Sequence, residues 1–143
     1  EYVTGIMGCE PEEVRTLAVP EPTGVDALTA IIMRFQNGAI GDCLCAINGY
    51  MDDTAIISGT RGYIKQHRFW GSRKAELFTS SSPEPEEVFE DDETEGFVHE
   101  IRHFCELYSA GETESGLIPL EDSLNFARRA DEVLKALSSP LDP

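Results

Sequence analysis

The sequence has few basic residues and no long apolar run. No stretch approaches the roughly 20 apolar residues that a membrane-spanning helix needs. Only 11 lysines and arginines stand against 27 aspartates and glutamates, which gives a net charge of −16. A surface of this sign repels phosphate backbones and anionic lipid headgroups. We therefore expect neither nucleic acid nor a membrane as a partner.

The glycine motifs that hold nucleotides are also missing. No two of the 12 glycines are two residues apart, so the chain has no Gly-x-Gly turn where backbone approaches a pyrophosphate. A Gly-x-x-x-x-Gly-Lys phosphate loop is absent as well. We predict that these residues bind no NAD or NADP, and we find no catalytic group of residues in the chain.

The four cysteines lack the spacing of a metal site or a disulfide framework. Cys43 and Cys45 are two apart, whereas a zinc knuckle places two residues between its ligands. We predict buried free thiols, which is typical of a protein in the reducing cytoplasm.

Eight acidic residues crowd into residues 84–95. This run lacks the alternating Asp or Asn ligands around a central glycine that a calcium loop needs. We predict a solvated acidic loop there, and no metal site.

Alternating and β-prone segments dominate the first two thirds of the chain. They predict strands at residues 1–8, 12–19, 25–35, 39–47, 54–58, 63–66 and 74–79. Asn37-Gly38 predicts a type I′ hairpin turn, and residues 59–62 form a second turn. Apolar residues then recur with a helical period, which predicts helices over residues 97–111 and 120–137. Their stripes include Phe97, Ile101 and Tyr108 in the first helix and Leu124 in the second.

This order of elements predicts the α+β class. We expect an open, mostly antiparallel sheet with the two C-terminal helices packed on one face. Residues 25–35 are apolar on both faces of their strand, so both faces need covering. The helices cover one face, and we expect a second subunit to cover the other, which predicts a homodimer.

Two groups of residues are candidates for function. His99-Glu100-x-x-His103 matches the zinc peptidase pattern, but both histidines fall on the helix side away from the apolar stripe, and no third ligand motif follows. The second group is His67, Arg68, Phe69 and Trp70, which joins a titratable ring and a cation to two large aromatic rings. Such groups line pockets for small molecules, although core packing of Phe69 and Trp70 is the alternative.

Six short motifs follow one another along the chain. The first three are the Phe-x-Asn-Gly-Ala hairpin at residues 35–39, the Ile-x-Gly-Thr-x-Gly-x-Ile hairpin at residues 57–64, and Phe69-Trp70. The others are Gly-Phe-x-x-Glu-Ile at residues 96–101, Gly-x-x-Glu-Ser at residues 111–115, and the closing helix from Pro119. Together they resemble the C-terminal domain of the glucose–fructose oxidoreductase and inositol dehydrogenase (Gfo/Idh/MocA) family, in its dihydrodiol-dehydrogenase-like branch.

The resemblance implies that residues 1–143 form a single C-terminal substrate-binding and dimerisation domain. The N-terminal Rossmann domain, with its glycine fingerprint, and the family's Glu-Lys-Pro are absent from this sequence. The implied parent is an NAD(P)-dependent dehydrogenase of a sugar, polyol or diol carbinol. Residues 67–70 would supply part of its substrate pocket, and this chain alone would be inactive.

Two other interpretations stay open at this point. One is a stand-alone, non-catalytic binding or assembly module. The other is the zinc metallopeptidase with His99 and His103 as ligands and Glu100 as base.

Overall fold

The computed structural model describes residues 2–79, 82–92 and 96–137. The chain divides into two compact units: residues 1–51 with 114–143, and residues 52–113. The elements are antiparallel strands and helices, which confirms the α+β class. The strands form two antiparallel sheets, one in each unit, because β3 and β4 are not hydrogen-bonded neighbours.

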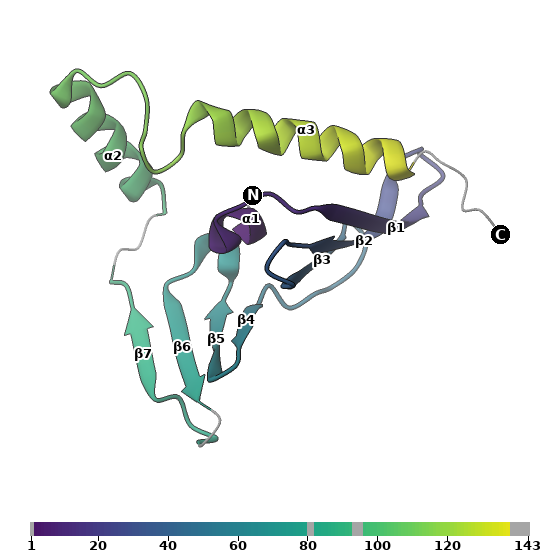
Figure 1. Cartoon of the computed structure of the whole chain (residues 1–143), viewed down its shortest axis with the longest axis horizontal. Coiled ribbons are helices and arrows are strands. Elements are labelled where there is room, and N and C mark those ends of the chain that lie inside the picture. The colour runs from purple at the N-terminus through teal and green to yellow at the C-terminus, as the bar shows by residue number, and fades with distance from the viewer. Residues whose placement is uncertain (1, 80–81, 93–95, 138–143) are drawn as a thin grey trace. The chain divides into compact units, whose positions relative to one another are not determined.

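The first unit is built on a sheet of order β1-β2-β3 (Figure 1). Its strands are β1 (Glu13–Pro20), β2 (Asp26–Arg34) and β3 (Ile40–Ala46), and helix α3 (Leu120–Leu137) packs beside β1. Ala27, Thr29 and Phe35 are buried on one face of the sheet. Ile32 points to the other face and is 50% exposed, so among the described residues of the first unit only one face of this sheet is covered.

The predicted strand at residues 1–8 is wrong, because this segment contains helix α1 (Tyr2–Met7). Gly8 adopts φ 65° and its amide donates to the Thr4 carbonyl, which ends the helix. β-branched residues in a short segment are a weak signal that tertiary contacts override. Here Val3 lies against Gly41 of β3, where a Cβ added to Gly41 would fall 2.5 Å from Val3 Cγ1.

The first hairpin has the predicted position but not the predicted type I′ turn. A type I′ turn needs positive φ at both Asn37 and Gly38. Gly38 has φ 80°, but Asn37 does not, because Arg68 is the only non-glycine residue with positive φ in the described part of the chain. The Gly38 amide donates to the Phe35 carbonyl and the Phe35 amide donates to the Ala39 carbonyl. This is the longer hairpin loop in which a turn is followed by a left-handed glycine. Asn37 stabilises it by accepting the Ala39 amide at 2.9 Å.

The second unit holds a four-stranded sheet of order β4-β5-β6-β7 (Figure 1). Its strands are β4 (Ala55–Gly59), β5 (Gly62–His67), β6 (Lys74–Thr79) and β7 (Glu87–Glu90), with the short 3-10 turn η1 (Phe69–Gly71) after β5. The expected acidic loop therefore contains a strand, which pairs Glu90 with Lys74 of β6. Opposite charges across strands favour that pairing. Glu93 and Glu95 lie outside the described residues.

Helix α2 (Phe97–Ala110) ends as predicted, at Gly111 with φ 74°. Its predicted apolar stripe is not buried, since Phe97, Ile101 and Tyr108 are 71%, 62% and 79% exposed. In the described residues, no helix is both long and apolar enough to cross a membrane.

All four cysteines are free thiols, as predicted. Their predicted burial is wrong for Cys9, Cys45 and Cys105, which are exposed, whereas Cys43 is half-buried. Cys43 and Cys45 share one face of an outer strand of a three-stranded sheet, where cover is incomplete.

Candidate functional site

The second hairpin positions the predicted pocket residues. In the β4–β5 ladder Gly59 pairs with Gly62 and Ala55 with Gln66. Continuing this register past the last pair places Asp53, just before β4, opposite Arg68, just after β5. The backbone confirms that closeness, because the Phe69 amide donates to the Asp53 carbonyl at 2.9 Å.

Trp70 is held in this corner by hydrogen bonding and by a cation. Its indole Nε1 donates to Asp53 Oδ2 at 3.0 Å. The Arg68 guanidinium carbon lies over the ring, 5.0 Å from the centroid, in a cation–π contact. The indole remains 64% exposed and Phe69 39% exposed. Pure core packing, the alternative interpretation, therefore does not describe Trp70. We name Asp53, Arg68, Phe69 and Trp70 the indole corner.

Arg68 has a strained backbone. Its φ of 49° and ψ of 60° lie in the left-handed region, which costs a side-chain-bearing residue about 1–2 kcal/mol. The amide of Gly71 donates to the Arg68 carbonyl at 2.8 Å and closes the turn. Strain of this kind is often kept where it places functional side chains.

His67 belongs to a different group of residues. Its Nε2 lies 2.7 Å from Glu76 Oε2, and Lys74 Nζ lies 2.7 Å from Glu76 Oε1. The hydrogen bonds from His67 and then Lys74 lower the pKa of Glu76 to about 2. Glu76 is therefore a carboxylate at neutral pH, held across β5 and β6.

The four predicted residues thus divide into two groups. Arg68, Phe69 and Trp70 come together at the indole corner, whereas His67 pairs with Glu76 on the sheet face. Sequence reasoning missed Asp53 and Glu76. The signal for Asp53 was present, because the predicted turn at residues 59–62 fixes a register that sets Asp53 opposite Arg68.

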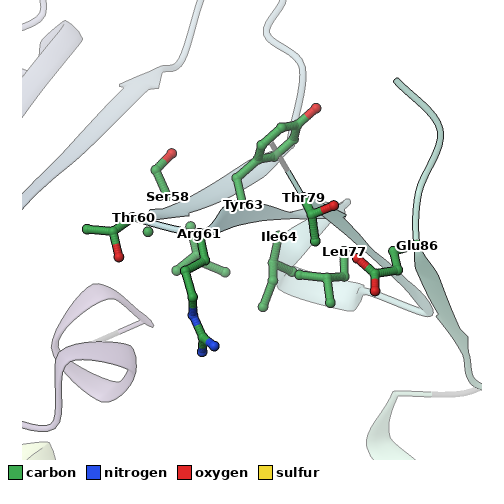
Figure 2. Close-up of a pocket in the computed structure, with 11 residues that line it drawn as sticks. Ser58, Thr60, Arg61, Tyr63, Ile64, Leu77, Thr79 and Glu86 are labelled. Carbon is green, nitrogen blue, oxygen red and sulfur yellow. The ribbon is translucent and has the colours of Figure 1, made fainter. Parts of the chain in front are cut away.

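A hollow of about 600 Å³ lies at the other end of the same hairpin (Figure 2). Ile57, Ile64 and Leu77 form its apolar floor, and Figure 2 shows Arg61 extending on the side of Ile64 while Tyr63 points away. None of residues 67–70 lines it. Because β5 separates the turn from His67 by about 17 Å at 3.3 Å per residue, hollow and indole corner are distinct places on the unit.

The peptidase motif does not form a metal site. His99 Nε2 lies 3.3 Å from Asp91 Oδ2, and both side chains are partly exposed. In the described part of the chain, no three His, Cys, Asp or Glu side chains are grouped to hold a metal ion. The structure gives the zinc peptidase interpretation no support.

No family model matches the sequence. Three mammalian trans-1,2-dihydrobenzene-1,2-diol dehydrogenases are similar to it. The enzyme of Mus musculus is 25% identical over 142 residues, that of Bos taurus 28% over 146 and that of Homo sapiens 27% over 135. These alignments cover 96%, 96% and 91% of this chain, but only 43%, 43% and 40% of the enzymes. The chain spans less than half the length of these relatives.

Two solved structures with a similar fold are sugar oxidoreductases. The aldose–aldose oxidoreductase of Caulobacter crescentus has a TM-score of 0.77 at 18% identity, covering 94% of this chain and 41% of that protein. A UDP-N-acetylglucosamine 3-dehydrogenase of Acidithiobacillus ferrooxidans has a TM-score of 0.74 at 15% identity, covering 91% and 41%. At these identities the likeness shows the fold.

These comparisons confirm the resemblance that the motifs predicted: the chain is similar to the C-terminal domain of the Gfo/Idh/MocA oxidoreductases. Within that class, the similar sequences named above are dihydrodiol dehydrogenases, which is the predicted branch.

Proposed function

We propose that residues 1–143 are the substrate-binding and dimerisation domain of an NAD(P)-dependent dehydrogenase that acts on a carbinol of a sugar, polyol or diol. The observation that carries the proposal is the pattern of coverage. Almost the whole chain aligns with dihydrodiol dehydrogenases, but less than half of each enzyme is matched. The remaining part of such an enzyme has room for a Rossmann domain.

The cofactor, NAD or NADP, is assigned to that other domain. The described residues do not fit a dinucleotide, because the sequence has no Gly-x-Gly turn to admit a pyrophosphate. The chain also has no Lys-Pro to supply the family's lysine for proton transfer. We therefore propose that this chain alone is inactive.

What these residues do is orient the substrate. The indole corner offers an exposed aromatic face and a guanidinium, the kind of surface on which sugar rings and aromatic diols rest. We assign Arg68, Phe69 and Trp70 to the pocket wall. His67 stands at the end of β5, where its bond to Glu76 fixes it beside that wall.

The uncovered face of the first sheet supports a homodimer. Val19, Leu28 and Ala46 are register partners on this face, as are Leu17, Ala30 and Leu44. Leu17, Val19, Ile32 and Leu44 are each at least 50% exposed. Contiguous apolar surface of this kind marks an interaction site, and a second copy of the chain is the occupant we propose. Four free thiols and the absence of a disulfide further support a cytoplasmic protein.

The test of the pocket is Trp70→Ala in the protein in which this chain follows its nucleotide-binding domain. A trans-dihydrobenzenediol and an aldose serve as substrates. We expect KM to rise about tenfold, because an aromatic contact contributes about 1–1.5 kcal/mol. Phe89→Ala is the matched control, since Phe89 is an equally exposed aromatic, at 68%, on strand β7. An unchanged KM and kcat in Trp70→Ala would overturn the pocket assignment.

The coding sequence upstream of Glu1 tests the domain assignment. A strand followed by Gly-x-Gly-x-x-Gly, and later a Glu-Lys-Pro, would support the dehydrogenase. A start codon close to Glu1 would instead leave the stand-alone binding module.

A further inference from the structure

We propose that Asp53 is a positioning residue for substrate binding, which acts by fixing the indole of Trp70. This inference rests on the proposed function, because it assigns Trp70 to the pocket wall. Asp53 has no place in the motifs that carry the family resemblance, and it lies on the segment before β4 rather than among residues 67–70.

Asp53 contacts the indole corner at two points. Its carboxylate accepts the indole N–H at 3.0 Å, and its backbone carbonyl accepts the Phe69 amide at 2.9 Å. The first contact sets the orientation of the ring, and the second sets the start of the η1 turn that carries it. Asp53 therefore holds the side chain of Trp70 and the backbone of Phe69.

The indole needs such a restraint because little protein surrounds it. Trp70 is 64% exposed, so packing alone does not select one orientation of the ring. Arg68 lies over one face of the ring and Asp53 holds its N–H edge. With the ring held in this way, the rest of its surface stays open to a ligand. A ligand that stacks on it meets a surface already ordered, so binding loses less side-chain entropy.

The charge of Asp53 also acts through the ring. A carboxylate that accepts the indole N–H makes a stronger hydrogen bond than a neutral acceptor does. The ring also carries a cation on its face, so opposite charges lie at its edge and its face. The exposed surface of the Trp70 indole therefore suits a ligand surface of C–H groups, such as a sugar ring or a cyclic diol, with its hydroxyls turned outward.

The first test uses the chain itself, since Trp70 is its one tryptophan. The indole N–H then gives one resonance in a ¹⁵N-labelled sample, and its exchange with water reports on the bond to Asp53. We expect Asp53→Ala to speed this exchange about fivefold, the loss of about one hydrogen bond. Asp53→Asn keeps an acceptor oxygen and is expected to restore much of the protection. It also keeps the test open if Asp53→Ala fails to fold.

Asp52→Ala is the matched control. It removes the same charge one residue away, where Asp52 accepts the hydroxyl of Thr54 and not the indole. An exchange rate in Asp53→Ala within a factor of two of the Asp52→Ala rate would overturn the inference. That result would leave the proposed function untouched, because that function rests on the coverage of the dihydrodiol dehydrogenases and on residues 68–70, and not on Asp53.

The second test uses the dehydrogenase that contains this chain, with the same diol and aldose. Asp53→Ala is expected to raise KM about fivefold with a smaller change in kcat, because the residue orients a binding surface. In a Trp70→Phe background, where the ring has no N–H to donate, Asp53→Ala is expected to change KM by less than twofold. An equal rise in KM in both backgrounds would show that Asp53 acts independently of Trp70 and would overturn the inference. If Trp70→Ala leaves KM unchanged, the pocket assignment fails, whereas the exchange test still reports on Asp53.

Discussion

Glu76 lies between two basic partners, and stability should depend on its charge. The hydrogen bonds from His67 and Lys74 lower its pKa from 4.5 to about 2. A lowered pKa in the folded state contributes stability that is fully present above the unfolded value of 4.5. That contribution is lost as the pH falls from about 4.5 towards 2. We expect Glu76→Gln to be less stable than the wild type at pH 6, and the difference to disappear near pH 2. Urea unfolding across this pH range measures it.

Glu90→Gln is the control for this prediction. Glu90 pairs with Lys74 in the strand register, as a neighbour on the same face, but Lys74 directs its ion pair to Glu76. Its substitution should leave a pH profile parallel to that of the wild type. A Glu76→Gln profile that is also parallel would contradict the assignment of the acid-sensitive stability to Glu76.

Cys43 differs from the other three thiols in its surroundings. Burial raises the pKa of the Cys43 thiol, whereas Cys9, Cys45 and Cys105 are exposed. Since the thiolate is the reactive form, Cys43 should be alkylated last. Iodoacetamide labelling at pH 7.5, followed by peptide mass analysis, is expected to show three fast sites and one slow site. In concentrated urea all four rates should become similar, and fast labelling of Cys43 in the native chain would contradict the structure.

At the scale of elements, the pairing of β5 with β6 depends on Gly62. A Cβ added at Gly62 would lie 2.1 Å from the Phe78 carbonyl oxygen, which is backbone of the neighbouring strand. Gly62→Ala must therefore push β5 away from β6, and we expect a loss of about 2–3 kcal/mol in the free energy of unfolding. Gly59→Ala is the control in the same turn, because its Cβ would meet only the Gly62 carbonyl oxygen at 3.6 Å. Equal losses in urea unfolding would show that the approach to Phe78 is not the cause.

Elements with a strong local signal were predicted well. Strand β6 and helix α3 have the predicted bounds, and Gly111 ends helix α2 as expected. The errors fall where a contact decides the structure. The segment that forms α1 is β-prone, but Val3 packs against Gly41. The acidic segment forms β7 because β6 has an open edge to pair with.

The candidate site was also predicted where the signal is local and missed where a distant contact decides the structure. Local sequence indicated the group at residues 67–70, because its aromatic and basic residues are adjacent in the chain. It did not separate His67 from Trp70, which required the partners Glu76 and Asp53. Those partners lie nine and seventeen residues away in sequence and come close only through strand register. Helical periodicity predicted helix α2 but not its surroundings, and its apolar stripe is exposed.

At the scale of the whole molecule, high charge and exposed apolar surface occur together. A net charge of −16 makes copies of the chain repel one another, and salt weakens that repulsion. The uncovered face of the first sheet attracts copies through apolar contact, which salt does not screen. A dimer held by this face should therefore tighten as salt is raised from about 0.02 to about 0.3 M, the range in which the Debye length falls below about 10 Å.

The dimer prediction is tested by Ile32→Lys, which adds a charge to that face on the middle strand β2, beside the apolar rows of Leu28 and Ala30. Burying an isoleucine contributes about 1.5–3 kcal/mol, and two-fold symmetry removes it twice. The dissociation constant measured by analytical ultracentrifugation should then rise at least about a hundredfold. Leu124→Lys is the matched control, since Leu124 is also 50% exposed but lies on helix α3. A wild-type chain that stays monomeric at high salt, or equal weakening by both substitutions, would show that this face is covered by something other than a second copy.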